Sequence, residues 1–273
     1  MIKQMGLILM LFSGMTLGAK TCNKFDIEKS GTDWGIPDKC YVLWYAGSDI
    51  PIQDVKALAS ALKENTPLHS LSLWDSGLDV EGVKVLAEVL KDNNRLAALD
   101  LSENEIGDDG VTELAKAMKD KKDIKLTSLK LSNTGITHMG VEELVTAMKE
   151  NESIKLNKLK LSNNSIGDDG VTELVKVLEN NDSLTYLALE NTGIGDDGAK
   201  ALANVLENND KLTYLILSKN EIGDDGAKAL AQALKVDQTL TTLNLSDNKI
   251  GYIYKVILKN LPRVKSGYLT LDI

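Results

Sequence analysis

Paired aspartates are the side chains of this sequence best placed to do chemistry, because they recur at regular intervals. The triplet Asp-Asp-Gly occurs four times, at Asp108–Gly110, Asp168–Gly170, Asp196–Gly198 and Asp224–Gly226. Stacked carboxylates could bind calcium, which takes oxygen ligands. Each pair also lies where a helix is expected to begin, and acidic side chains are favoured at that end of a helix. We therefore expect the aspartates to cap helices, with calcium binding as the alternative.

Motifs that indicate catalysis are missing from the sequence. There is no GxSxG elbow, no phosphate-binding P-loop, no HExxH zinc motif and no Cys/His pair after Cys40. The carboxylates recur at equivalent positions of a repeat, so no two of them stand out as an acid–base couple. The two histidines, His69 and His138, are not accompanied by the CxxC spacing of a zinc site. We expect a protein that is not an enzyme and that uses no metal and no cofactor.

An internal repeat supplies the elements that position these side chains. The pattern LxxLxLxx(N/T)xI recurs in steps of 28, 30, 30, 28, 28 and 28 residues. Its seven starts are Leu68, Leu96, Leu126, Leu156, Leu184, Leu212 and Leu240. The same period predicts a degenerate unit that begins near Cys40 and a last strand at Leu271 and Ile273. A period of this length is typical of a solenoid, in which stacked units bury one continuous core.

Each unit changes its hydrophobic spacing once. Leu99 and Leu101 alternate as in a strand, whereas Val111, Leu114 and Met118 recur at helical spacing. Parallel strands lie about 4.8 Å apart, whereas packed helices need about 8–10 Å. Because of this difference the stack must curve. The predicted fold is an α/β solenoid, or horseshoe, with parallel strands on the concave face and α-helices on the convex face.

The units resemble leucine-rich repeats of the ribonuclease-inhibitor-like type. LAALDLSENEIGDDGVTELAKAM and LTYLILSKNEIGDDGAKALAQAL carry the resemblance best, and it covers roughly residues 40–273. It implies a horseshoe that binds a protein, without naming that protein. Ribonuclease inhibitor is itself rich in cysteine, unlike these repeats. The resemblance also implies that the asparagines Asn104, Asn164 and Asn220, which alternate with Thr134 and Thr192 at one position of the repeat, bond the backbone of the neighbouring loops.

Two clusters stand out among the residues expected on the concave wall. Side chains alternate along a strand, so the residues between the leucines point into the groove, and most of them are small or polar. The basic cluster is composed of Lys130, Lys158 and Lys160. The apolar cluster is composed of Tyr186, Ala188, Tyr214 and Ile216. Tyrosines rimmed by charge are typical of interfaces. We predict a protein partner here, with its acidic or hydrogen-bonding group at the lysines; alternatively, tyrosines simply favour strands and the lysines are solvated.

The N-terminus is typical of an exported protein. Lys3 precedes an uncharged apolar stretch, residues 5–17, which is too short for a membrane span of about 20 residues. We expect a signal peptide at 1–19, an N-terminal cap segment at 20–39 and the repeat domain at 40–273. A buried helix and an uncleaved anchor are the alternatives for the first segment. The only two cysteines, Cys22 and Cys40, are expected to pair after export, with free thiols as the alternative.

The predicted function is non-catalytic protein binding by a secreted or surface-exposed protein. The net charge of −9 disfavours a nucleic-acid partner. We expect no small-molecule cofactor, and no membrane contact once the signal peptide is removed. One alternative is a regulatory scaffold in the cytoplasm or delivered to a host. The other is a GTPase-activating protein built on such repeats, for which only Arg95 and Arg263 could supply the arginine.

Overall fold

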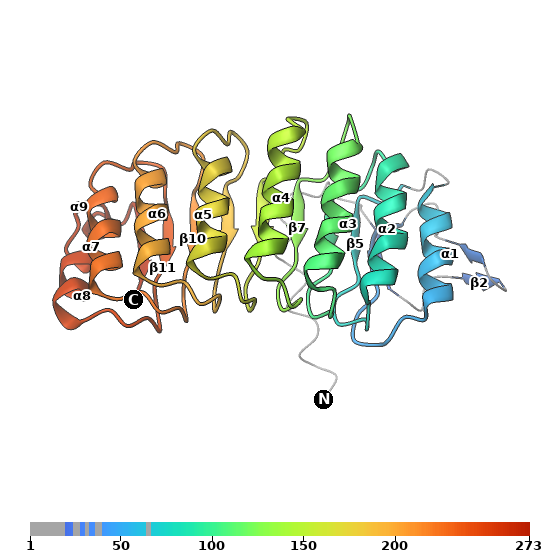
Figure 1. Cartoon of the computed structure of the whole chain (residues 1–273), viewed down its shortest axis with the longest axis horizontal. Helices are drawn as coiled ribbons and strands as arrows, with labels where there is room; N and C mark the ends of the chain where they lie inside the picture. Colours follow the sequence, from blue (N-terminus) through green and yellow to red (C-terminus); the bar gives the residue numbers. More distant parts are fainter. Residues whose placement is uncertain (1–19, 24–27, 31–32, 36–39, 64–66) are drawn as a thin grey trace.

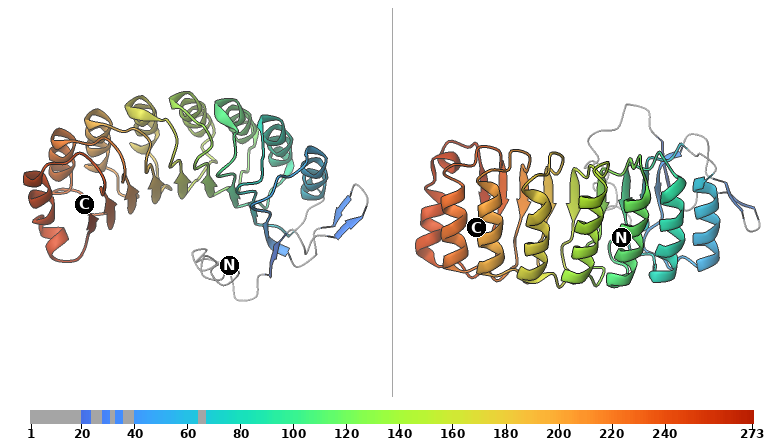
Figure 2. Two further views of the ribbon diagram at one scale, coloured as in Figure 1. Left: turned by 90° about the horizontal axis from the view of Figure 1, so that it is seen from below. Right: turned by 45° about the horizontal axis from the view of Figure 1, so that its top comes forward.

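The protein is a curved solenoid. The computed structural model describes residues 20–23, 28–30, 33–35, 40–63 and 67–273, so the predicted signal peptide lies outside the described residues. One ten-stranded parallel sheet runs in the order β1-β4-β5-β6-β7-β8-β9-β10-β11-β12 (Figure 1). Seen from below, the strands line the inside of an arc and the helices its outside (Figure 2). The prediction of an α/β solenoid is confirmed.

Each unit from β4 to β10 is one strand followed by one helix, and β11 is followed by two. The strands of the main sheet are β1 Lys20–Asn23, β4 Cys40–Trp44, β5 Ser70–Ser72, β6 Ala98–Asp100, β7 Ser128–Lys130, β8 Lys158–Lys160, β9 Tyr186–Ala188, β10 Tyr214–Ile216, β11 Thr242–Asn244 and β12 Thr270–Asp272. The helices are α1 Ile52–Lys63, α2 Val80–Asp92, α3 Gly107–Asp120, α4 His138–Glu150, α5 Gly167–Leu178, α6 Asp196–Leu206, α7 Asp224–Ala233, α8 Tyr252–Lys259 and α9 Pro262–Lys265. The degenerate first unit and the last strand occur where the period predicted them.

A separate hairpin lies at the N-terminal end of the arc. Its strands β2 (Glu28–Ser30) and β3 (Asp33–Gly35) are antiparallel, and β3 contacts α1. The segment predicted as an N-terminal cap thus holds β1, which extends the main sheet, and this hairpin.

A continuous leucine core holds the units together. From β5 to β11 the middle residue of each strand is a leucine that pairs in register with the leucines of both neighbouring strands, as Leu159 does with Leu129 and Leu187. Among these leucines, all those from β5 to β11 are almost fully buried. Neighbouring units therefore share one core and none is a separate globule.

Buried asparagines connect the loops that follow the strands. Asn164 Oδ1 accepts hydrogen bonds from the backbone N–H groups of Thr134 and Ile136 in the preceding unit, at 3.0 and 3.1 Å. Its Nδ2 donates to the carbonyls of Leu131 and Leu161. The role implied by the resemblance is thereby confirmed. The same arrangement repeats at Asn104 and Asn220.

The first aspartate of each Asp-Asp-Gly triplet caps the helix of the next unit. Asp108 Oδ1 accepts from the N–H groups of Thr137 and Gly140 at the start of α4, at 2.8 and 3.0 Å. Its own helix, α3, follows Ile106 without any side-chain cap. The expected acidic helix start is present, since Asp108 and Asp109 lie in the first turn of α3. The hydrogen bonds, however, cap the next helix and not the helix that the pair begins, because the side chain points sideways to the neighbouring unit. Asp168 and Asp196 each accept the same two hydrogen bonds, and Asp224 accepts one, from the N–H of Gly251.

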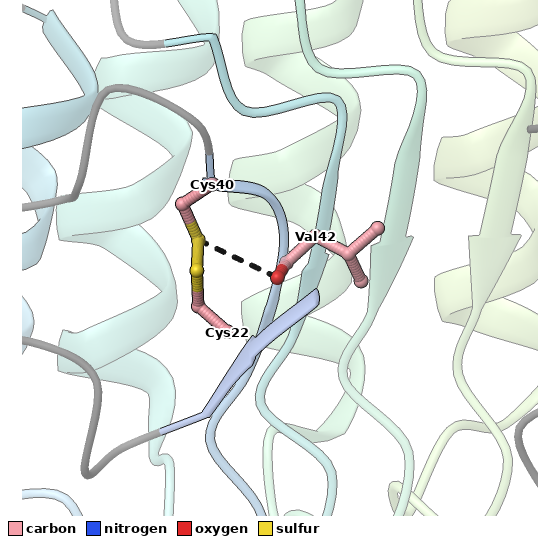
Figure 3. Close-up of a disulfide and its surroundings, with 3 residues drawn as sticks. All are labelled: Cys22, Cys40 and Val42. Atoms are coloured by element: carbon pink, nitrogen blue, oxygen red, sulfur yellow. Dashed lines mark hydrogen bonds between the residues drawn. A yellow bond between two sulfur atoms is a disulfide. The ribbon is translucent and has the colours of Figure 1, made fainter. Parts of the chain in front are cut away.

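A disulfide ties β1 to the first repeat. Cys22 in β1 and Cys40 in β4 are fully buried, their Cα atoms are 5.8 Å apart, and their sulfur atoms are bonded (Figure 3). The two cysteines lie on adjacent strands that pair along their length. The disulfide therefore links the start of the sheet to the first unit of the solenoid.

Candidate functional site

The side chains on either side of the buried leucines form two rows across the concave wall. In the first row Tyr186 pairs with Lys158 on one side and with Tyr214 on the other. In the second row Lys160 pairs with Lys130 and with Ala188. The predicted basic and aromatic clusters are therefore next to each other, on β7 to β10.

Two tyrosines and two lysines are in direct contact at the centre of this region. The rings of Tyr186 and Tyr214 stack with their centroids 5.7 Å apart and an angle of 26° between the ring planes. The Nζ atoms of Lys158 and Lys160 lie 4.7 and 5.5 Å from the centroid of the Tyr186 ring, within the range of cation–π attraction. Together with Ile216, a half-buried apolar residue of β10, we name these residues the tyrosine–lysine step.

Burial changes the ionisation of the step. The pKa values of Lys158 and Lys160 are lowered, first because burial disfavours the charged amine and then because Lys130 is positive. The pKa of Tyr186 is raised, mainly by burial and then by the charge of Glu190. Within the described chain neither Lys158 nor Lys160 forms an ion pair. The step thus holds two partly desolvated cations that form no ion pair with the described residues.

Lys130 differs from the other two lysines. Its Nζ lies 2.8 Å from Asp100 Oδ2, and both side chains are largely buried. The sequence placed Asp100 and Lys130 on the same wall but did not reveal that they neutralise each other. The predicted three-lysine cluster therefore presents two uncompensated charges, those of Lys158 and Lys160.

The comparisons with known proteins agree with this architecture. A family model described as a leucine-rich repeat matches five segments of the chain, residues 92–115, 152–175, 180–203, 208–231 and 236–252. The chain is a leucine-rich-repeat protein. No curated protein matches its sequence.

Solved structures that are similar to the chain have low sequence identity to it. A Bacteroides fragilis protein aligns with a TM-score of 0.55 and 17% identity over 86% of this chain and 66% of its own. Leiomodin-1 actin-binding site 2 aligns with a TM-score of 0.49 and 23% identity, over 59% of this chain and 90% of its own. The tropomodulin C-terminal domain of Caenorhabditis elegans aligns with a TM-score of 0.49 and 14% identity, over 58% of this chain and 93% of its own. The likeness to the Bacteroides protein supports the fold of this leucine-rich-repeat protein and says nothing of its partner.

Ala188 does not belong to the accessible surface of the step. Only 4% of it is exposed, so the prediction that it contributes to an exposed apolar patch is wrong. It lies in the second row between Lys160 and Ile216, and a methyl group does not reach past these longer neighbours. Tyr214, at 44%, is the most exposed aromatic residue of the step.

The concave rows also include two residues of the predicted degenerate first unit that were not among the predicted groove residues. Val42 and Trp44 in β4 pair with Ser70 and Ser72, which puts both on the concave rows. Trp74, in the loop after β5, is 40% exposed. Counting back one period from Leu71 would have identified Val42 and Trp44, because they flank the predicted leucine at position 43.

Calcium should not be needed for the fold. The described part of the chain has no group of three or more His, Cys, Asp or Glu side chains that could hold a metal ion, and Asp108 Oδ1 already accepts two backbone hydrogen bonds. We predict the same melting temperature in calcium and in excess EDTA. A melting temperature that falls in the chelator would instead assign the aspartates to calcium.

The same part of the leucine-rich-repeat protein contains no helix with the length and apolarity needed to cross a membrane.

Proposed function

We propose that this leucine-rich-repeat protein is a non-catalytic, secreted or surface-exposed binding protein whose protein partner docks on the concave wall at the tyrosine–lysine step. The observation that carries the proposal is the stack of Tyr186 and Tyr214 beside two lysines without carboxylate partners. Buried tyrosines at the centre of an interface often dominate binding energy. Export is supported by the apolar N-terminal stretch and by the paired cysteines.

The step is suited to an acidic group of the partner. Lys158 and Lys160 are held against the Tyr186 ring. Their side chains therefore lose little conformational entropy when a carboxylate binds them. Their partial burial strengthens the attraction to an anion relative to a fully solvated lysine. An apolar side chain of the partner would cover Tyr214 and Ile216 at the same time.

Of the two arginines that a GTPase-activating protein could use, Arg263 is already bound within the fold. Arg263 donates from Nη1 to Asp237 Oδ2 at 2.7 Å and from Nη2 to the carbonyl of Leu240 at 2.7 Å. Only 12% of its side chain is exposed. An arginine fixed in this way stabilises the fold and is unsuited to enter another protein's active site.

Replacing the stacked tyrosines tests the proposal. We expect Tyr186→Ala/Tyr214→Ala to weaken binding of the captured partner by roughly 30-fold or more, the effect of losing one strong interface residue. Affinity capture with the wild-type protein identifies the partner, and titration with each variant measures the change. Met139→Ala, which removes an exposed apolar side chain from α4, is the control and should bind normally. Equal affinity for all three proteins would end the proposal.

The lowered lysine pKa values predict a dependence on pH. A carboxylate binds only the protonated amines, so affinity should fall as the pH rises through pKa values that lie below those of ordinary lysines. Lys158→Arg/Lys160→Arg keeps both charges at high pH and should abolish this fall. A wild-type affinity that is flat over the alkaline range would show that the amines do not contact an acid.

A further inference from the structure

The outward side of α8 is apolar at positions that are polar in the preceding helices. α8 lies at the C-terminal end of the row of helices on the outside of the arc (Figures 1 and 2). One period of 28 residues earlier, Ile253 and Val256 of α8 correspond to Asp225 and Lys228 of α7. The same two positions hold Asp197 and Lys200 in α6, Asp169 and Thr172 in α5, Met139 and Glu142 in α4, and Asp109 and Thr112 in α3. Among α3 to α8, only α8 has apolar residues at both.

Four apolar side chains form a contiguous patch on this side of α8. Tyr252, Ile253, Val256 and Ile257 are between 38% and 81% exposed. With 3.6 residues per turn they fall within one sector of the helix, roughly 140° wide, whereas Leu258, toward the core, is fully buried. We name these four residues the outer face. Single apolar residues are ordinary on a surface, but a contiguous patch marks a contact site.

The segment around α8 is basic, although the protein is acidic. Residues 248–271 contain no acidic side chain and five basic ones, which are Lys249, Lys255, Lys259, Arg263 and Lys265. The whole chain carries −9, so the other residues together carry −14. In physiological salt, exposed charges act over only about 8 Å. A surface that approaches α8 is therefore attracted by this local charge more than it is repelled by the acidic residues elsewhere in the chain.

Three of the five cations remain available to a ligand. Lys249 and Arg263 are paired with carboxylates of the preceding unit. In the part of the chain that the structure describes, the other three, Lys255, Lys259 and Lys265, form no ion pair. Lys255 follows Tyr252 by three residues and precedes Lys259 by four, so both lysines lie along one border of the outer face. Apolar side chains and unpaired positive charges are thus presented together.

We propose that the outer face of α8 docks the protein on an anionic lipid bilayer. The helix then lies in the plane of the bilayer surface, with its four apolar side chains at the boundary between headgroups and acyl chains. The lysines contact the negatively charged headgroups. Tyrosine is favoured at this boundary because its ring is apolar and its hydroxyl is polar. The proposal replaces the expectation, drawn from the sequence, that the protein does not contact a membrane.

The shape of this surface favours a bilayer over a folded protein partner. The outer face is a ridge, because its side chains project from the convex side of the arc. A folded protein needs a matching groove to cover such a helix, whereas lipids rearrange around it. The tyrosine–lysine step lies on the opposite, concave wall, so docking through α8 leaves that wall open to a protein partner.

Binding of the whole chain to lipid vesicles tests the proposal. We expect the wild-type protein to float with vesicles of phosphatidylcholine mixed with phosphatidylglycerol. Binding to vesicles of phosphatidylcholine alone should be at least roughly 10-fold weaker, because the lysines then meet no net charge. Added salt should weaken binding to the anionic vesicles by screening. These comparisons use the wild-type protein and do not depend on the folding of any variant.

Two double substitutions separate the apolar contribution from the charged one. Ile253→Asp/Val256→Lys gives α8 the residues of α7 without changing the net charge, and should weaken binding to anionic vesicles by roughly 30-fold or more. Lys255→Gln/Lys259→Gln should weaken it by roughly 30-fold and leave the weak binding to phosphatidylcholine unchanged. Met139→Gln removes an exposed apolar side chain from α4 and, as the matched control, should bind like the wild type.

Three outcomes would overturn the proposal. The first is a wild-type protein that does not float with anionic vesicles, and the second is equal binding to neutral and anionic vesicles. The third is vesicle binding that Ile253→Asp/Val256→Lys leaves unchanged; if this variant instead lost a protein from affinity capture, the outer face would be a protein interface. Tyr186→Ala/Tyr214→Ala should bind vesicles normally, so the proposed function and the lipid contact can fail independently.

Discussion

Replacing Asn164 by aspartate should lower the free energy of unfolding by about 3–5 kcal/mol at neutral pH, as uncompensated buried charges do. Asn164 is almost fully buried. Its Nδ2 donates to the carbonyls of Leu131, Leu161 and Ser162 at 2.7, 2.8 and 3.3 Å. In Asn164→Asp a negatively charged oxygen would face these three carbonyls, and each of them would lose a donor.

The neighbouring residue provides a matched control for this measurement. Asn163→Asp makes the same chemical change one residue earlier, on an exposed side chain, and should alter the free energy of unfolding by less than about 0.5 kcal/mol. Chemical denaturation of both variants gives the comparison. The introduced carboxyl group has a raised pKa in the folded protein, so the loss should shrink as the pH falls through that pKa. Equal losses at positions 163 and 164 would contradict the structural role of the buried amide.

Replacing Arg263 should cost a similar amount, about 3–5 kcal/mol, because it leaves a buried carboxylate without its cation. Only 1% of the Asp237 side chain is exposed, and it lies 2.7 Å from Arg263 Nη1. The same guanidinium also donates to the carbonyls of Asp237 and Leu240, so it joins α9 to the turn after α7. In Arg263→Met the last unit should unfold first, and the loss should be measurable by denaturation.

A double-mutant cycle separates the charge effect from lost packing. Asp237→Asn keeps an oxygen that can accept from the N–H groups of Thr239 and Leu240. Combined with Arg263→Met, it should therefore recover much of the lost stability, because no unpaired charge remains. Lys265→Met, on the exposed side of α9, serves as the control and should be nearly neutral. A double variant no more stable than Arg263→Met would show that the carboxylate is not the cause.

The repeat spacing was sufficient to predict the strand positions, the inward leucines and the curvature, because these follow from one period and from strand and helix dimensions. The position of Tyr186 beside Lys158 and Tyr214 also followed, since equivalent residues of parallel strands lie side by side. Val42 and Trp44 occupy equivalent positions on β4. They were not predicted as groove residues because the first unit departs from the consensus.

Contacts between units were harder to predict from one sequence. The direction of the Asp108 side chain depends on the position of the next loop, so its bond to α4 was not apparent from the Asp-Asp-Gly motif. The burial of Ala188 depends on the lengths of the side chains around it, and the neutralisation of Lys130 depends on its partner Asp100. The asparagine contacts were predicted from the resemblance to known repeats. They connect the loops of adjacent units and do not depend on which residues line the groove.

The most direct test of the proposed function is photo-crosslinking from single positions of the protein to the captured partner. A photoreactive side chain at Tyr214, on the concave wall, should give a covalent adduct with the partner. The same group at Lys228, exposed on α7 on the convex side, should give none. Adducts from position 228 without adducts from position 214 would contradict binding at the tyrosine–lysine step.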